Sequence, residues 1–215
     1  MLAPAFEKYS HFSFDLDGTL IDSLAMMEIA WETVNEKTGI NIPFIRYKQS
    51  IGLPFDQILA NVGVTEGNSE IKKIYFETTQ SLVKSALIFE GAFDLLRALA
   101  QRENTVVSII TSKPISNAIN LLDHFNLNYS SIAGGDSTVL GKPTFFPFLK
   151  IEKDLGLEKG LRASTVYFGD MLSDFVFATN CNITYCHCNF GFYGSLSSHI
   201  RSNYLSIGSW WDVLK

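Results

Sequence analysis

Short apolar runs alternate along this chain with stretches of helical periodicity. Three runs, at residues 12–14, 106–110 and 166–168, are nearly continuous in apolar or β-prone residues. Continuous runs of this kind are typical of parallel strands, because helices cover both faces of a parallel sheet. The pattern therefore predicts buried strands of one parallel sheet, and the run at 184–188 is expected to be its last core strand.

Helical periodicity fills the stretches around these strands. The helices that it predicts around the strands are at residues 24–37, 92–101, 115–125, 145–155 and 172–179. Strands that alternate with helices in this way predict an α/β fold with helices on both sides of a doubly wound parallel sheet.

The segment from residue 21 to residue 86 breaks the alternation, because it has helical periodicity and loops but no convincing strand. Within it, helices are expected at 24–37, 55–61 and 69–85. We expect this segment to be a small all-helical domain over the sheet edge, and residues 1–20 and 87–215 to form the core. The chain is expected to return to the core near Glu90-Gly91.

Composition narrows the class of protein. Of the 215 residues, 47% are hydrophobic, which is enough for one sizeable core or for a core domain and a small second domain. The net charge of -5 lacks the basic surplus of nucleic-acid-binding proteins. No apolar run approaches the ~18 residues of a membrane span, and the three closely spaced cysteines suggest reduced thiols. We expect a cytoplasmic protein that binds neither nucleic acid nor membrane.

Acidic and hydroxyl side chains follow three of the predicted strands. Asp15 and Asp17 follow the first, Thr111 the second, and Asp170 and Asp174 the third. The C-terminal ends of parallel strands lie at one edge of a sheet, where open α/β sheets bind ligands. An Asp-Gly pair alone would indicate an ordinary turn, but three such strand ends predict a shared site.

The negative charges of these carboxylates must be offset if the side chains meet. Two unit charges ~4 Å apart repel by ~4 kcal/mol at an effective dielectric constant near 20, so four carboxylates need a cation or large upward pKa shifts. Lys142, between Gly141 and Pro143, is one candidate. Oxygen ligands favour a hard divalent ion such as Mg²⁺. A calcium-binding hand is excluded, because Leu24 stands where its loop needs a glutamate.

Four segments together resemble the motifs of the haloacid dehalogenase superfamily, in order and in spacing. They are Asp15-Leu16-Asp17-Gly18-Thr19, Thr111, Lys142 and Gly169-Asp170-Met171-Leu172-Ser173-Asp174. The stretches Thr111-Ser112-Lys113-Pro114, Gly134-Gly135-Asp136 and Gly141-Lys142-Pro143 are similar to the phosphoglycolate phosphatase-like branch, although Ser112 stands where that branch often has Asn. The resemblance covers most of the chain. It implies a Rossmann-like core, an inserted helical cap domain and magnesium-dependent phosphatase activity.

The resemblance also implies roles for the matched residues. Asp15 would attack phosphorus and form an aspartyl-phosphate, and Asp17 would serve as general acid and base. Thr111 would hydrogen-bond the phosphoryl oxygens, while Lys142 offsets their charge. The expected metal ligands are Asp15, Asp17, Asp170 and Asp174. Asp17 could instead bind through its backbone carbonyl, and Asp174 could orient other ligands.

Substrate contacts are expected from both parts of the chain. The substrate-binding residues that we predict are Gly18, Ser112, Lys113 and, from the cap, Arg46. By resemblance alone, the favoured substrate among small phosphorylated metabolites is phosphoglycolate. The oligomeric state is expected to be a monomer or a homodimer.

Several alternatives remain beside this interpretation. Asp170 and Asp174 could cap the following helix. A zinc site is another possibility, because four potential ligands lie close together in the sequence: Cys181, Cys186, His187 and Cys188. Strand alternation, however, places His187 on the face opposite Cys186 and Cys188. A β-phosphoglucomutase-type mutase would share every core motif, and a non-catalytic binding protein would normally have lost one. A dehalogenase is disfavoured, because it lacks the second aspartate and needs no metal.

Overall fold

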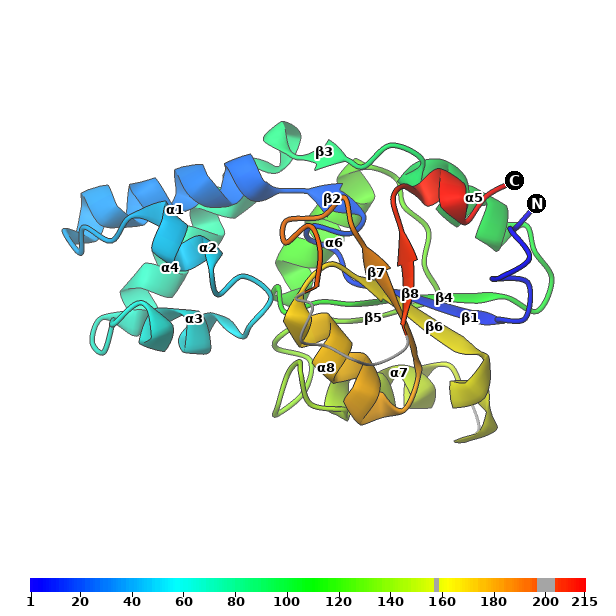
Figure 1. Ribbon diagram of the computed structural model, residues 1–215. Helices are drawn as coiled ribbons and strands as arrows, with labels where there is room; N and C mark the ends of the chain where they lie inside the picture. Colours follow the sequence, from blue (N-terminus) through cyan, green and yellow to red (C-terminus); the bar gives the residue numbers. More distant parts are fainter. Residues whose placement is uncertain (157–158, 197–203) are drawn as a thin grey trace.

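A six-stranded sheet forms the centre of the molecule (Figure 1). The computed structural model describes residues 1–156, 159–196 and 204–215. The strand order is β5-β4-β1-β6-β7-β8, and every neighbouring pair is parallel. The strands are β1 (His11–Phe14), β4 (Val106–Ile110), β5 (Ser131–Ala133), β6 (Thr165–Gly169), β7 (Thr184–Cys188) and β8 (Leu205–Ile207). The predicted parallel sheet is confirmed. The pattern missed β5 and β8, which are only three residues long.

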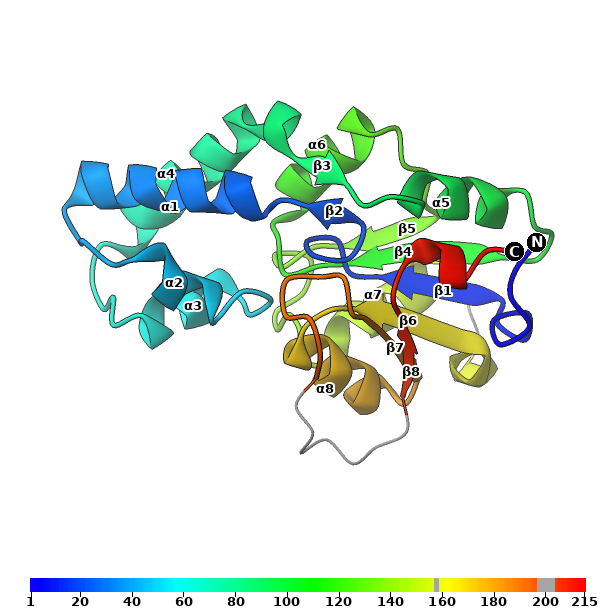
Figure 2. The same cartoon turned by 45° about the horizontal axis from the view of Figure 1, so that its top comes forward.

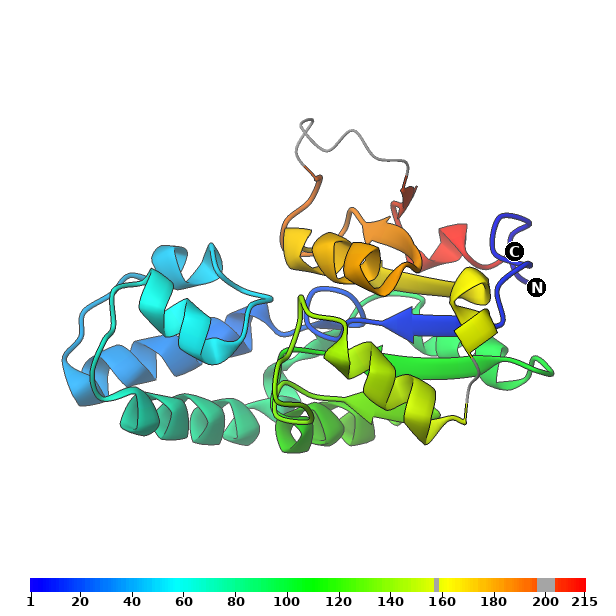
Figure 3. The same ribbon diagram turned by 90° about the horizontal axis from the view of Figure 1, so that it is seen from below.

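Helices cover both faces of the sheet. Those of the core are α5 (Ala92–Ala100), α6 (Ile115–His124), α7 (Phe146–Asp154) and α8 (Leu172–Cys181). The buried residues of α5 and α6 belong to one hydrophobic cluster and those of α7 and α8 to another, and the two pairs lie on opposite sides of the sheet in Figures 1 and 3. The predicted doubly wound α/β fold is confirmed.

Aromatic side chains fill the face beneath α5 and α6. Phe12 and Phe14 alternate along β1 with Ser13, so both rings lie on this face. The Phe14 ring stacks on Phe168 with 5.0 Å between centroids, and Trp210 meets both rings edge-on. Trp210 is fully buried, so it belongs to the packing of this face.

The segment between β1 and α5 forms a helical insert, defined here as Leu24–Ser81. It consists of α1 (Leu24–Thr38), α2 (Phe44–Lys48), α3 (Phe55–Asn61) and α4 (Asn68–Ser81). The short α2 was not predicted. The insert has its own hydrophobic cluster around Trp31 and Leu59, and it extends away from the sheet in Figure 2. Its treatment as a separate domain, with a boundary at residues 21 and 86, stays a prediction.

Two short strands connect the helical insert to the core. β2 (Ile21–Asp22) pairs antiparallel with β3 (Leu87–Ile88). The expectation of no strand between residues 21 and 86 was therefore wrong for β2, since a two-residue strand has too short a pattern to detect. The chain rejoins the core at β3, shortly before the expected Glu90-Gly91, and the short turn-like helix η1 (Val83–Ser85) precedes β3.

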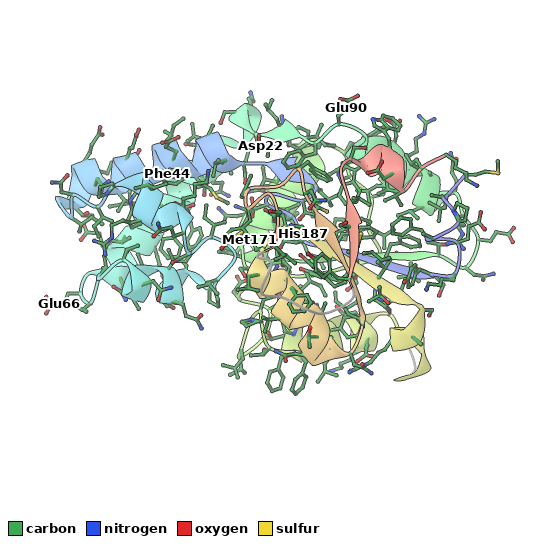
Figure 4. The ribbon with its side chains drawn as sticks, viewed as in Figure 1. Asp22, Phe44, Glu66, Glu90, Met171 and His187 are labelled. Carbon is green, nitrogen blue, oxygen red and sulfur yellow. The ribbon has the colours of Figure 1, made fainter. Side chains whose placement is uncertain are left out.

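Three contacts hold the helical insert over the carboxyl-terminal edge of the sheet. Met171, which follows β6, packs into the insert's hydrophobic cluster and lies at the junction in Figure 4. The Ser112 hydroxyl donates to the carbonyl of Gly52 at 2.8 Å, and the Asn117 amide donates to the carbonyl of Phe76 at 3.1 Å. The insert and the strand ends therefore face one another across a common boundary.

The two chain ends meet on the far side of the core. The backbone N–H of Lys215 donates to the carbonyl of Met1 at 2.7 Å, and Leu2 forms a bridge with Leu214. In the described ranges, no helix is both long and apolar enough to cross a bilayer.

Replacement of Trp31 by alanine tests the separate packing of the helical insert. Trp31 is fully buried in the insert's cluster, and loss of a large core aromatic costs about 3–5 kcal/mol. We expect Trp31→Ala to increase amide hydrogen exchange in α1–α4 and to leave exchange in β1 and β4 unchanged. Trp31→Phe is the control, and equal deprotection of the core strands would contradict separate packing.

Candidate active site

Asp15 lies at the end of the central strand β1, where the backbone fixes its position. Its N–H donates to the carbonyl of Phe168 in β6 at 2.8 Å, which continues the parallel pairing beyond the end of β1. The chain then turns sharply at Gly18, whose φ is +85°. A Cβ at Gly18 would lie 2.5 Å from the carboxylate of Asp170. Glycine is required here by both its conformation and this close approach.

Lys142 links two of the predicted site carboxylates. Its side chain is 1% exposed, and Nζ lies 2.5 Å from Asp15 Oδ1 and 2.7 Å from Asp174 Oδ1. Nζ also donates to the Tyr167 hydroxyl at 3.0 Å. Burial alone would lower the pKa of Lys142, but the two carboxylates outweigh it and raise the pKa above its ordinary value. Lys142 therefore stays charged beneath the site.

Three carboxylates cluster around this lysine. Oxygens of Asp15, Asp170 and Asp174 all lie within 4.8 Å of one another, and all three residues are buried. Burial raises the pKa of Asp15 to about 7, opposed by Lys142 and assisted by the charge of Asp174. Burial also raises the pKa of Asp170 well above its ordinary value, with Asp174 and Asp15 adding to the effect. When all three are ionised, Lys142 balances only one of their three charges.

The surroundings of this cluster suit a divalent cation. The two uncompensated charges match Mg²⁺, and carboxylate oxygens are its preferred protein ligands. The backbone N–H of Phe192 donates to Asp170 Oδ2 at 2.7 Å and so orients that carboxylate. A Cβ at Gly191 would lie 2.2 Å from the Cβ of Asp170. The chain thus packs closely around Asp170 and leaves its carboxylate beside the other two.

Asp174 is held more tightly than the other two carboxylates. Its Oδ1 accepts from Lys142 and lies 3.1 Å from the Tyr167 hydroxyl, while its Oδ2 accepts from the backbone N–H of Met171 at 3.0 Å. Asp174 therefore caps α8 as well as belonging to the acidic cluster, so the capping alternative and the site prediction describe the same side chain.

Asp17 has a different environment from Asp15. Its Oδ1 accepts from the Ser23 hydroxyl at 2.5 Å and lies 3.2 Å from Lys113 Nζ. Its carboxylate is not part of the acidic cluster formed by the other three aspartates. The predicted side-chain ligand role of Asp17 therefore has no support in the geometry, and its backbone carbonyl stays the alternative.

A hollow of about 480 Å³ lies above the strand ends, between the core and the helical insert. The core residues that line it are Asp15, Asp17, Thr111, Ser112 and Lys113. The insert residues that line it are Met27, Tyr47, Ile51, Gly52, Leu53, Phe55, Ile58, Tyr75 and Phe76. The two predicted catalytic aspartates therefore open onto the same space.

The remaining predicted site residues take different positions. Thr111 is buried and its Oγ1 accepts the N–H of Lys113 at 3.1 Å, which leaves its own proton for a ligand in the hollow. Ser112 uses its hydroxyl to bind the insert. Arg46 is exposed on α2 and does not line the hollow, whereas its neighbour Tyr47 does. The structure thus places Arg46 outside the site, because the helix turns it towards solvent.

Sequence reasoning missed two side chains that support the site. Ser23 precedes the first insert helix, but its side chain makes no capping bond and contacts Asp17 instead. Tyr167 lies within a continuously buried strand, so no pattern distinguished its hydroxyl from ordinary packing. A hydroxyl six residues after Asp17 was the one available signal.

The cysteine-rich strand β7 does not form a metal site. Cys186 and Cys188 pack in the cluster beneath α5 and α6. His187 lies on the other face, where its ring nitrogens meet the Tyr185 hydroxyl at 2.9 Å and the Gly194 carbonyl at 3.0 Å. Within the described ranges, only the three aspartates group as possible metal ligands.

Comparisons with known proteins agree with this geometry. The family model of haloacid dehalogenase-like hydrolases matches residues 13–188. A phosphoglycolate phosphatase of Neisseria meningitidis is 28% identical over 208 residues, covering 90% of this chain and 85% of that protein. A hydrolase of Pseudomonas syringae has a similar structure, with a TM-score of 0.79, 26% identity and 92% of each chain covered. A haloacid dehalogenase-like protein of Streptococcus pneumoniae gives a TM-score of 0.77 at 21% identity, with 93% of this chain and 94% of that chain covered. The chain belongs to the haloacid dehalogenase-like hydrolase family.

Proposed function

We propose that this chain is a magnesium-dependent phosphatase that hydrolyses a small phosphorylated metabolite through an aspartyl-phosphate on Asp15. The observation that carries the proposal is the pairing of Asp15 with Lys142 at the floor of a hollow that Asp17 also lines. The names of the relatives favour phosphoglycolate as the first substrate to test.

Phosphoryl transfer to Asp15 is the first step. Lys142 holds Oδ1 of Asp15, which leaves Oδ2 to attack phosphorus. The bond between phosphorus and the alcohol oxygen breaks, and protonated Asp17 gives its proton to that oxygen. The Thr111 hydroxyl is available to donate to a phosphoryl oxygen. Bound Mg²⁺, held by Asp15 and Asp170 with Asp174 beside them, would offset the charge of the phosphoryl group.

Hydrolysis of the aspartyl-phosphate is the second step. Asp17, now ionised, takes a proton from a water molecule as the water oxygen attacks phosphorus, and the bond to Asp15 breaks to release phosphate. Ser23 and Lys113 hold the Asp17 carboxylate in place through both steps. In this mechanism, Asp15 is the nucleophile and Asp17 is the acid–base group.

The mutase alternative has less support. A phosphohexose mutase must hold the hydroxyl groups of a sugar, which calls for many hydrogen-bonding side chains. Among the insert residues that line the hollow, only Tyr47 and Tyr75 carry a hydroxyl, and most of the others are apolar. Hydrolysis of a smaller ester fits this lining better.

Asp15→Asn tests the nucleophile. The amide keeps the size of the side chain but is a poor nucleophile, so we expect release of phosphate from 4-nitrophenyl phosphate with Mg²⁺ to be abolished. The melting temperature should show a folded protein. Turnover close to that of the unaltered enzyme would refute the assignment.

Asp17→Asn tests the acid–base group through the leaving alcohol. Loss of a general acid costs typically ~100- to 10,000-fold, and the cost is greatest when the leaving oxygen is strongly basic. We expect kcat/KM to fall far more for an alkyl phosphate than for 4-nitrophenyl phosphate, whose leaving group needs little protonation. An equal loss with both esters would argue against proton donation by Asp17.

The raised pKa of Asp15 predicts a pH-dependent stability of the metal-free protein. Its folded pKa is about 7 and its ordinary value 3.8, so between these values the folded state binds more protons than the unfolded state. Stability should therefore fall as pH rises through this range. We expect a lower melting temperature at about pH 8 than at about pH 5.5, and a larger increase on adding Mg²⁺ at the higher pH.

Two variants control this measurement. Asp15→Asn removes the titrating group, so its metal-free melting temperature should depend less on pH. Glu66→Gln changes an exposed carboxylate at the far end of the helical insert (Figure 4) and should behave like the unaltered protein. A melting temperature that rises from about pH 5.5 to about pH 8 without metal would contradict the burial of Asp15 as an ionisable group.

A further inference from the structure

The wall that the helical insert contributes to the hollow carries no charge. Nine residues of the insert line the hollow, and six of them have apolar side chains, namely Met27, Ile51, Leu53, Phe55, Ile58 and Phe76. The other three lining residues are Gly52 and two tyrosines. This wall lies opposite the catalytic aspartates, so it faces the part of a substrate that leaves as the alcohol.

The basic residues of the helical insert lie elsewhere. Lys37, Arg46, Lys48, Lys72 and Lys73 are the basic residues between Leu24 and Ser81, a segment that the structure describes throughout, and none of them lines the hollow. Lys72, for example, is paired with Asp56 at 2.6 Å. A second anionic group on a substrate would find no cation on this wall.

Lys113 is the one basic residue among the lining residues, and it already contacts a carboxyl group of the site. Its Nζ lies 3.2 Å from Asp17, and both side chains are nearly buried. A substrate carboxylate near Lys113 would also lie near the carboxyl groups of Asp15 and Asp17, which already contact the lysines beside them. Burial of an anion without its own cation is unfavourable, so this lysine does not make the hollow suited to a carboxylate.

Tyr47 and Tyr75 are the only residues of the wall with polar side-chain atoms. Their hydroxyl oxygens are 2.6 Å apart, and each residue is 3% exposed. Burial raises the pKa of both phenols, so both stay neutral. One hydroxyl proton bridges the pair and the other is available, which allows one hydrogen bond to an uncharged oxygen of a ligand.

We propose that the substrate is the phosphate monoester of a small, uncharged and largely apolar or aromatic alcohol, and that the insert's wall discriminates against leaving groups that carry a carboxylate. The inference rests on the proposed phosphatase function and narrows its substrate class. It places phosphoglycolate, which carries a carboxylate next to its ester, among the poorer substrates of this chain.

Matched pairs of esters test this inference. With Mg²⁺ present, kcat/KM is measured for ethyl phosphate against 2-phosphoglycolate and for phenyl phosphate against 4-carboxyphenyl phosphate. We expect the neutral ester of each pair to be preferred by about tenfold or more, which corresponds to at least ~1.4 kcal/mol. Equal or higher kcat/KM for the carboxylate esters would overturn the inference while leaving the phosphatase proposal intact. No phosphate release from any of the four esters would overturn both.

A charge-insertion variant supplies a second readout. Leu53 is partly exposed on the loop before α3 and lines the hollow, so Leu53→Lys places a cation on the wall without opening the insert's core. We expect this variant to shift the kcat/KM ratio of each pair towards the carboxylate ester. Ile45→Lys adds the same charge at a position on α2 that is 62% exposed and outside the hollow, and it should leave the ratio unchanged. An unchanged ratio in Leu53→Lys, with a normal melting temperature, counts against discrimination by this wall.

Discussion

The rest of the site depends on the balance of charge around Lys142. This lysine is almost completely buried between Asp15 and Asp174, and neither a lone lysine nor two lone carboxylates would be stable there. Asp170 adds a third carboxylate that the lysine cannot balance. The protein therefore holds an excess of negative charge at the end of β1, and a divalent cation fits that excess in both sign and position.

The same constraint explains why two aspartates separated by one residue differ in character. Asp15 lies on the axis of β1 and takes its environment from the buried lysine. Asp17 lies beyond the strand end, where a hydroxyl and a second lysine hold it at the wall of the hollow. In the proposed mechanism, the first carboxylate is the positioned nucleophile and the second exchanges protons with the substrate and with water.

In the proposed function, the core carries out the reaction and the helical insert selects the substrate. The ends of the core strands supply every charged group that lines the hollow, and the helical insert supplies a neutral wall. The bond from Ser112 to the Gly52 carbonyl fixes the position of one part against the other. Ser112, which follows Thr111 at the strand end, thus joins the two parts through its hydroxyl.

The sequence by itself determined the parallel sheet, most of its helices and the acidic cluster at the strand ends. These features follow from local patterns, because buried parallel strands are continuously apolar and their carboxyl ends share one edge. Only the tertiary structure decided the contacts between residues distant in the chain. The link from Lys142 to Asp15 spans 127 positions, and the exposure of Arg46 beside the buried Tyr47 depends on how α2 packs. The sequence likewise could not predict the charge of the wall opposite the aspartates. Periodicity indicates which faces of the helices are apolar, but not which of these faces lines the hollow.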